Sequence, residues 1–113
     1  MYKILLVEDD PVIAAQVQRH LQQWDYEVAC VENFKCVLET FTTYRPHLVI
    51  LDILLPYYNG FYWCTQIRKE HDVPILFLSS ACDNMNIVMA VNMGGDDFVE
   101  KPFDLNVLTA KIQ

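Results

Sequence analysis

The chain has 113 residues, of which 53% are hydrophobic and 20% are charged, a composition typical of one globular domain rather than of a disordered segment. A formal net charge of −7 argues against binding to a nucleic-acid backbone, which needs clustered lysine and arginine. The first apolar run is too short for a signal peptide, and no run approaches the ~18–20 apolar residues of a membrane span, so we expect no membrane contact.

Strand-like and helix-like segments alternate five times along the chain. Short apolar runs predict strands at 4–7, 28–31, 48–52, 75–78 and 98–100. Apolar residues at helical spacing predict helices at 11–24, 34–44, 61–70, 84–93 and 105–113. This order predicts an α/β fold, in which a doubly wound parallel sheet has helices on both faces and the carboxyl ends of its strands at one edge.

Several side chains are assigned to helix ends or to packing. Asp10 is interpreted as an N-cap rather than a ligand, because a proline follows it directly. Asn33 and Asp104 are expected to cap later helices. Trp24 is expected to pack on the inward face of the first helix, and Trp63 to pack in the core.

Four cysteines are spread through the chain without the spacing of a zinc site or a disulfide framework. They are Cys30, Cys36, Cys64 and Cys82. We expect them to be reduced and mostly buried, which suits a cytoplasmic protein.

The predicted strands end in residues that can carry chemistry. Glu8 and Asp9 follow the first strand, and Asp52 ends the third. Three carboxylates at one edge would repel one another without a cation, and an oxygen-only ligand set with few carboxylates suits Mg²⁺. Ser79 ends the fourth strand and Lys101 follows the fifth. An aspartate beside Mg²⁺ and a lysine can act as a nucleophile toward phosphorus, so these residues predict phosphoryl transfer, with the serine hydroxyl sensing the transferred group.

The combined motifs resemble the receiver domain of bacterial two-component response regulators, and most closely its OmpR-type branch. They are Val7-Glu8-Asp9-Asp10, Leu51-Asp52-Ile53-Leu54-Leu55-Pro56 with Gly60, Leu78-Ser79-Ser80-Ala81, and Gly95-Asp96-Asp97-Phe98 with Lys101-Pro102-Phe103. The resemblance covers the whole chain, 1–113, as one receiver domain. It implies a flavodoxin-like, five-stranded sheet of order 2-1-3-4-5.

The resemblance also implies the roles of individual residues. Asp52 would accept a phosphoryl group from the histidine of a sensor kinase. Asp9 and Asp52 would ligate Mg²⁺ (with Mn²⁺ as a substitute), the Leu54 backbone carbonyl would add a ligand, and Glu8 would hold the metal through water. Lys101 would contact the phosphoryl oxygens.

Switching and output are implied in the same way. Ser79 would be the switch hydroxyl, and Phe98 the aromatic that turns inward when that hydroxyl moves. The surface formed by 84–93, 98–100 and the last helix would then control homodimerisation. The Lys101-Pro102 bond is expected to be cis. The last helix is expected to be truncated at Gln113, with a DNA-binding output domain beyond it. The resemblance also implies that the chain itself is a signalling domain rather than an enzyme.

Three departures from the family pattern carry further expectations. Asp25 stands where relatives carry glycine, and aspartate tolerates the left-handed conformation. Met89, in the nearly all-apolar segment 84–93, stands where a basic residue is common, so we expect a more hydrophobic activation interface. Leu54 and Ala81 cannot hydrogen-bond an attacking water, which predicts slow self-dephosphorylation.

Two alternatives stay open at this point. A haloacid-dehalogenase-type phosphatase would also use a strand-end aspartate with Mg²⁺, but it needs a second aspartate where this chain has Leu54. A phosphorylation-independent receiver would serve as an interaction module, and such domains usually lose the acids or the lysine. Tyr57 and Tyr58 are expected to be exposed beside the site, where they could contact the kinase or gate access.

Overall fold

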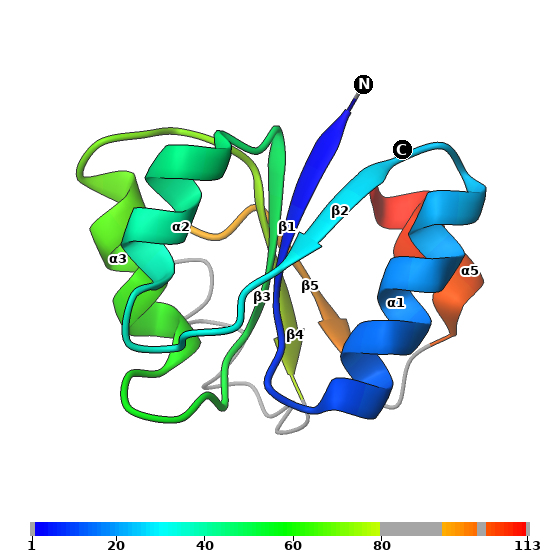
Figure 1. Cartoon of the computed structure of the whole chain (residues 1–113), viewed down its shortest axis with the longest axis horizontal. Helices are drawn as coiled ribbons and strands as arrows, with labels where there is room; N and C mark the ends of the chain where they lie inside the picture. Colours follow the sequence, from blue (N-terminus) through cyan, green and yellow to red (C-terminus); the bar gives the residue numbers. More distant parts are fainter. Residues whose placement is uncertain (1, 80–93, 102–103, 113) are drawn as a thin grey trace.

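Five parallel strands form one sheet with helices on both faces (Figure 1). The strands are β1 (Lys3–Val7), β2 (Glu27–Cys30), β3 (Leu48–Asp52), β4 (Ile75–Ser79) and β5 (Asp97–Glu100). The helices are α1 (Pro11–Gln23), α2 (Val37–Tyr44), α3 (Gly60–Arg68) and α5 (Leu105–Ile112). The strand order is β2-β1-β3-β4-β5, so the predicted doubly wound fold is confirmed.

The structure, a computed structural model, describes residues 2–79, 94–101 and 104–112, with only the backbone of Ser79 and Glu100. The predicted helix at 84–93, and with it Met89, lies outside these residues. Ala81, Cys82 and Pro102 lie outside them as well. None of the described helices is long and apolar enough to cross a bilayer.

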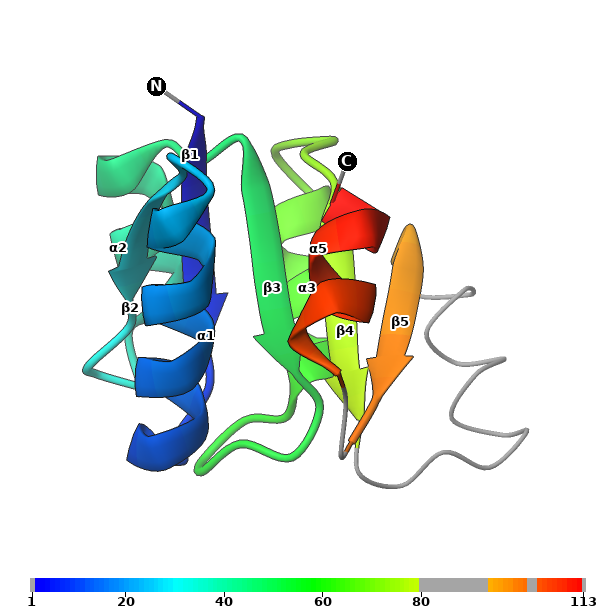
Figure 2. The same ribbon diagram turned by 90° about the vertical axis from the view of Figure 1, so that its right-hand side faces the viewer.

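The alternation of side chains along each strand divides the core into two halves, one on each face of the sheet. Leu5, Val49 and Phe77 point to the face covered by α2 and α3, where they pack with helix residues such as Phe41 and Ile67. Their chain neighbours point to the opposite face, which α1 and α5 cover (Figure 2). The central strand β3 is buried along its whole length, as its uninterrupted apolar run predicts.

The helix ends agree with the sequence in part. Asp10 caps α1 as predicted, because its carboxylate accepts hydrogen bonds from the Val12 and Ile13 amides. The prediction that Asn33 caps a helix beginning at residue 34 is wrong. The Asn33 side chain instead accepts from the Lys35 amide, at 3.0 Å, in a turn that delays α2 until Val37.

The prediction for the two tryptophans is half right. Trp63 is buried, whereas Trp24 is 51% exposed. Trp24 is the C-cap of α1, where the chain leaves the helical path, so the helical spacing that would have turned it inward no longer applies. Asp25 follows with a φ of 64°, as the expectation of a left-handed aspartate requires.

The register of the strands sets the position of the functional edge. β1 and β3 are paired so that Val7 lies opposite Leu51, which places Glu8 beside Asp52. β4 and β5 are paired so that Ser79 lies opposite Glu100, and Lys101 follows directly. The carboxyl ends of four strands therefore meet at one edge of the sheet.

Candidate functional site

A lysine stands between two buried carboxylates at this edge. The Lys101 Nζ lies 2.6 Å from Glu8 Oε1 and 3.2 Å from Asp52 Oδ2. Glu8 and Asp52 are 4% and 2% exposed, so both acids have left water and depend on this ammonium for compensation. The Asp10 amide donates a second contact, to Glu8 Oε2 at 3.1 Å.

A third carboxylate completes the acidic group. Carboxylate oxygens of Glu8, Asp9 and Asp52 all lie within 4.8 Å of one another, and Asp9 is exposed. Three carboxylates face one ammonium among the described residues, so the ionised group retains an excess of negative charge. Oxygen donors with an open, solvent-facing side are what Mg²⁺ needs, since this ion keeps several of its waters. The chemistry of the donor set therefore fits the predicted Mg²⁺ site.

Burial and charge pairing have opposing effects on the pKa values of the group. Burial raises the pKa of Glu8, and the nearby Asp52 adds to the increase, while the ion pair with Lys101 opposes it. Burial, with the charge of Glu8, also raises the pKa of Asp9. Burial works against the charge on Lys101, but Glu8 and Asp52 outweigh it and raise the pKa of this ammonium. The lysine therefore remains charged at neutral pH.

The loop that follows Asp52, residues 53–59, folds back so that its end lies against the end of β3. The Gly60 amide donates to the Ile53 carbonyl at 2.9 Å and closes the loop. A Cβ at position 60 would collide with the Asp52 carbonyl oxygen, so only glycine allows this approach. Asn59 begins α3 by accepting a hydrogen bond from the Tyr62 amide at 2.9 Å. The sequence pair Asn59-Gly60 is typical of a turn, but it does not reveal how near that turn lies to Asp52.

Tyr57, in the middle of this loop, has a conformation that sequence analysis missed. Its φ is 70°, and the Tyr58 amide donates across it to the Pro56 carbonyl at 2.9 Å. A three-residue turn with a positive φ at a bulky central residue is strained, by about 1–3 kcal/mol. The Lys35 Nζ lies 4.6 Å from the centroid of the Tyr57 ring. An exposed cation–π contact of this kind contributes about 0.5–1 kcal/mol.

Aromatic rings continue from the loop onto α3. Tyr58 stacks on Tyr62 with ring centroids 4.3 Å apart, and both rings meet Trp63 edge to face. Tyr57 and Tyr58 are 68% and 45% exposed, as expected from the sequence. The stack fixes Tyr58 against the helix, while Tyr57 extends into solvent beneath Lys35.

The other predicted site residues are placed less completely. Ser79 ends β4 at this edge, but its side chain lies outside the described part of the structure. Phe98 is half-buried and packs against the core on the α2 and α3 face. The Leu54 amide lies 3.4 Å from Asp52 Oδ1, and the Leu54 side chain is 58% exposed. The roles predicted for these residues stay predictions.

A second charged cluster lies at the opposite edge of the sheet, around Arg68. Its guanidinium donates to three backbone carbonyls, those of Gly94, Val73 and His71. It also pairs with Asp96 Oδ2 at 3.0 Å, and the same oxygen accepts from the Ile75 amide. Here the charges and donors satisfy one another, so this cluster joins α3, β4 and the segment before β5.

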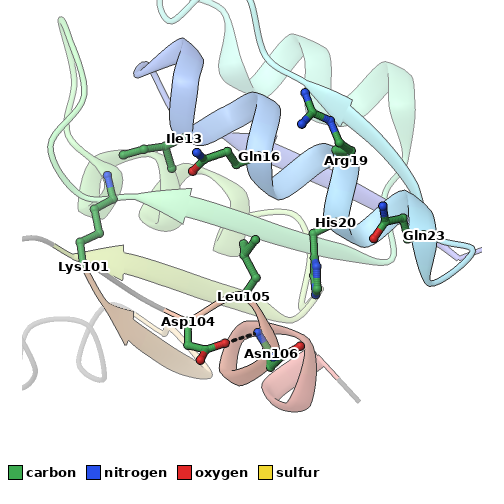
Figure 3. Close-up of a pocket in the computed structure, with 9 residues that line it drawn as sticks. All are labelled: Ile13, Gln16, Arg19, His20, Gln23, Lys101, Asp104, Leu105 and Asn106. Atoms are coloured by element: carbon green, nitrogen blue, oxygen red, sulfur yellow. Dashed lines mark hydrogen bonds between the residues drawn. The ribbon is translucent and has the colours of Figure 1, made fainter.

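A groove of about 700 Å³ separates α1 from α5 (Figure 3). Its walls combine the apolar side chains of Ile13 and Leu105 with polar and charged ones, and Lys101 lies at one end. His20 Nε2 and Thr109 Oγ1, 2.9 Å apart, link the two helices. Of Lys101 and the three acids around it, only Lys101 lines this groove. Among the described residues, the candidate functional site is therefore the acidic group at the strand ends and not the groove.

Comparisons with known proteins point to one family. Residues 4–113 match the family described as the response regulator receiver domain. The chain is 51% identical over 111 residues to the response regulator protein GraR of Staphylococcus epidermidis, a match covering 98% of this chain and 50% of that protein. It is 49% identical over 113 residues to the sensory transduction protein BceR of Halalkalibacterium halodurans, covering 100% and 49%. The chain thus spans about half the length of the curated relatives it matches.

Solved structures show the same likeness. The N-terminal domain of the nisin resistance regulator NsrR, a lantibiotic response regulator, matches with a TM-score of 0.91 and 48% identity, over 99% of this chain and 95% of that one. The BeF3-activated N-terminal receiver domain of Klebsiella pneumoniae RstA matches with a TM-score of 0.92 and 32% identity, over 97% and 94%.

Proposed function

Because this chain belongs to the response regulator receiver domains, which act in two-component phosphorylation signalling, we propose that Asp52 is the phosphoacceptor through which it is switched. Receiver domains take their signal from histidine kinases and are signalling domains rather than enzymes with a separate substrate. The observation that carries the proposal is the contact of Lys101 with Asp52 and Glu8 inside a three-carboxylate group.

The chemistry assigned to Asp52 is a phosphoryl transfer. A carboxylate oxygen forms a bond to phosphorus as the bond between phosphorus and the kinase histidine nitrogen breaks, and the electron pair returns to the imidazole. Asp52 is 2% exposed, so its carboxylate is held at a fixed place beside the Lys101 ammonium. That ammonium is positioned to balance the charge of phosphoryl oxygens.

Mg²⁺ is the proposed cofactor, with Mn²⁺ as a substitute. Asp9 and Asp52 would hold it directly with the Leu54 carbonyl, and Glu8 would hold it through water. When bound, the ion supplies charge neutralisation for the transferring group. Glu8 keeps its contacts with Lys101 and the Asp10 amide, so it serves to position the lysine as well.

The readout is proposed to pass through Ser79 and Phe98. The Ser79 hydroxyl would bind the phosphoryl group, and Phe98, which is half-buried in the structure, would turn further inward. These changes bias the surface formed by 84–93, β5 and α5 toward homodimerisation. We propose that residues 1–113 are a cytoplasmic receiver domain that acts together with a DNA-binding output domain of the OmpR type.

The test is phosphate uptake from acetyl phosphate, measured by phosphate-affinity gel shift with Mg²⁺ and with EDTA. The parent chain is expected to be phosphorylated only with Mg²⁺, and Asp52→Asn to take up none. Asp72→Asn, at an exposed acid before β4, is the matched control and should behave as the parent. Equal uptake by Asp52→Asn would exclude Asp52 as the acceptor.

The gel shift, combined with a measurement of inorganic phosphate released into solution, separates the two rival functions. A phosphatase would release phosphate continuously from acetyl phosphate instead of storing it on the protein. A phosphorylation-independent interaction module would take up none. We further propose a lifetime of many minutes for the phosphorylated chain, because the exposed Leu54 side chain offers no hydrogen bond to water. Loss of label within seconds would contradict this.

A further inference from the structure

The loop at 53–59 carries the Leu54 carbonyl. Most of the contacts that hold this loop are made within it or with the beginning of α3. Gly60 bonds back to Ile53, and Tyr58 stacks on α3. Apart from the Tyr58–Pro56 hydrogen bond across the turn, these contacts leave the Tyr57 ring unrestrained, because it is 68% exposed and gains little from burial. A bulky residue with positive φ needs support from its surroundings to persist.

That support comes from another part of the chain. Lys35 belongs to the connection between β2 and α2, which lies at the same edge of the sheet as the loop (Figure 1). The Asn33 side chain accepts from the Lys35 amide at 3.0 Å, and the Asn33 carbonyl accepts from the Cys36 amide at 3.1 Å. The Lys35 backbone is thereby fixed, and its ammonium lies over the Tyr57 ring.

We propose that Lys35 and Tyr57 form a latch that holds the 53–59 loop in the conformation needed for Mg²⁺ binding. The contact keeps Tyr57 in its left-handed turn, and this turn sets the path of the residues between it and Asp52, including Leu54. Both are positioning residues, since neither belongs to the acidic group. The inference rests on the proposed Mg²⁺ site and adds to it the residues that keep its loop in place.

The latch and simple electrostatics predict opposite effects of removing the Lys35 charge. A nearby ammonium repels a divalent cation, so its loss alone would strengthen Mg²⁺ binding. If Lys35 holds the loop, Lys35→Met weakens binding instead. The loss expected from one exposed cation–π contact is about two- to fivefold in the dissociation constant.

The experiment is a double-mutant cycle on the unphosphorylated chain, with Mg²⁺ affinity measured by isothermal titration calorimetry. Lys35→Met and Tyr57→Ala should each weaken binding about two- to fivefold, and the double variant no further. Lys35→Arg and Tyr57→Phe keep a cation and a ring, so they should bind as the parent does. The midpoint of urea unfolding in EDTA, which reports the fold, should shift only slightly in Lys35→Met and Tyr57→Ala, as expected for the loss of one exposed contact.

The outcomes distinguish the latch from the site it serves. Unchanged or tighter binding by Lys35→Met overturns the latch, and so do additive losses in the double variant. If the parent binds Mg²⁺ and Asp52→Asn does not, while Lys35→Met matches the parent, only the latch is wrong. If the parent binds no Mg²⁺, the proposed site and the latch are both wrong.

Discussion

A half-buried cation lies at each end of the parallel strands, Lys101 at the carboxyl ends and Arg68 at the amino ends. The two clusters differ in how completely the partners of the cation satisfy its charge and donors. Arg68 has three carbonyls and one carboxylate as partners, and its carboxylate partner also bonds a backbone amide. Lys101 has two carboxylates, with a third close by, and the group keeps surplus negative charge. A satisfied cluster holds the fold together, whereas an incompletely compensated one is prepared to bind a cation.

Removing Lys101 should have the largest effect on stability. Lys101→Met leaves Glu8 and Asp52 without their ammonium, so we expect the free energy of unfolding at pH 7 in EDTA to fall by about 3 kcal/mol. Glu8, whose pKa burial raises and Lys101 lowers, then binds a proton more readily in the folded chain than in the unfolded chain. The variant's stability should therefore rise as pH falls from 7 toward 5, and Mg²⁺ should restore part of the loss. Urea titration measures this, and no response to pH or Mg²⁺ would argue against uncompensated charge.

Removing Arg68 should lower stability without affecting the metal site. Arg68→Ala deprives three carbonyls and Asp96 of their donor, at a cost of about 2–3 kcal/mol in the free energy of unfolding. Mg²⁺ should not rescue this variant, and its Mg²⁺ affinity should equal that of the parent. Arg68→Lys keeps the charge but loses the planar fork, so we expect intermediate stability. A large change in Mg²⁺ affinity would mean that the two edges are coupled.

Mg²⁺ binding should weaken as the pH falls, and the weakening should begin at a higher pH than for a site of ordinary carboxylates. The ion binds ionised carboxylates, and the pKa values of Glu8 and Asp9 are both raised, so protons begin to compete above the range of ordinary acids. We expect affinity to be steady at higher pH and weaker at pH 5 than at pH 7. Calorimetry at a series of pH values tests this. Affinity that holds constant down to the range of an ordinary carboxylate would contradict it.

The smallest effect is expected at Asp10, an acid beside the site that serves the fold. Asp10→Ala removes the side-chain acceptor for the first α1 amides, which should lower the free energy of unfolding by about 1 kcal/mol. Its backbone amide would still donate to Glu8, so Mg²⁺ affinity should fall only slightly, through the loss of one nearby negative charge. A large loss of affinity would place Asp10 within the metal site.

The sequence predicted the described strands and helices, and the converging acids, because both follow from local patterns. Apolar runs and strand-end residues place Glu8, Asp52 and Lys101 at one edge without knowledge of distant contacts. It failed at Asn33 and Trp24, where a side-chain turn and a helix end override helical spacing. The contacts of Arg68 with Gly94 and of Lys35 with Tyr57 join segments far apart in the chain, and nothing in either segment alone signals the other.

The three consecutive acids at the end of β1 have consequences for how this corner can evolve. Glu8 contacts Lys101, Asp9 joins the acidic group, and Asp10 starts α1, so each successive residue has a different neighbour. One inserted or deleted residue would move all three to the wrong neighbour at once. Connections between secondary-structure elements usually vary freely in length among relatives. This one should accept no change in length.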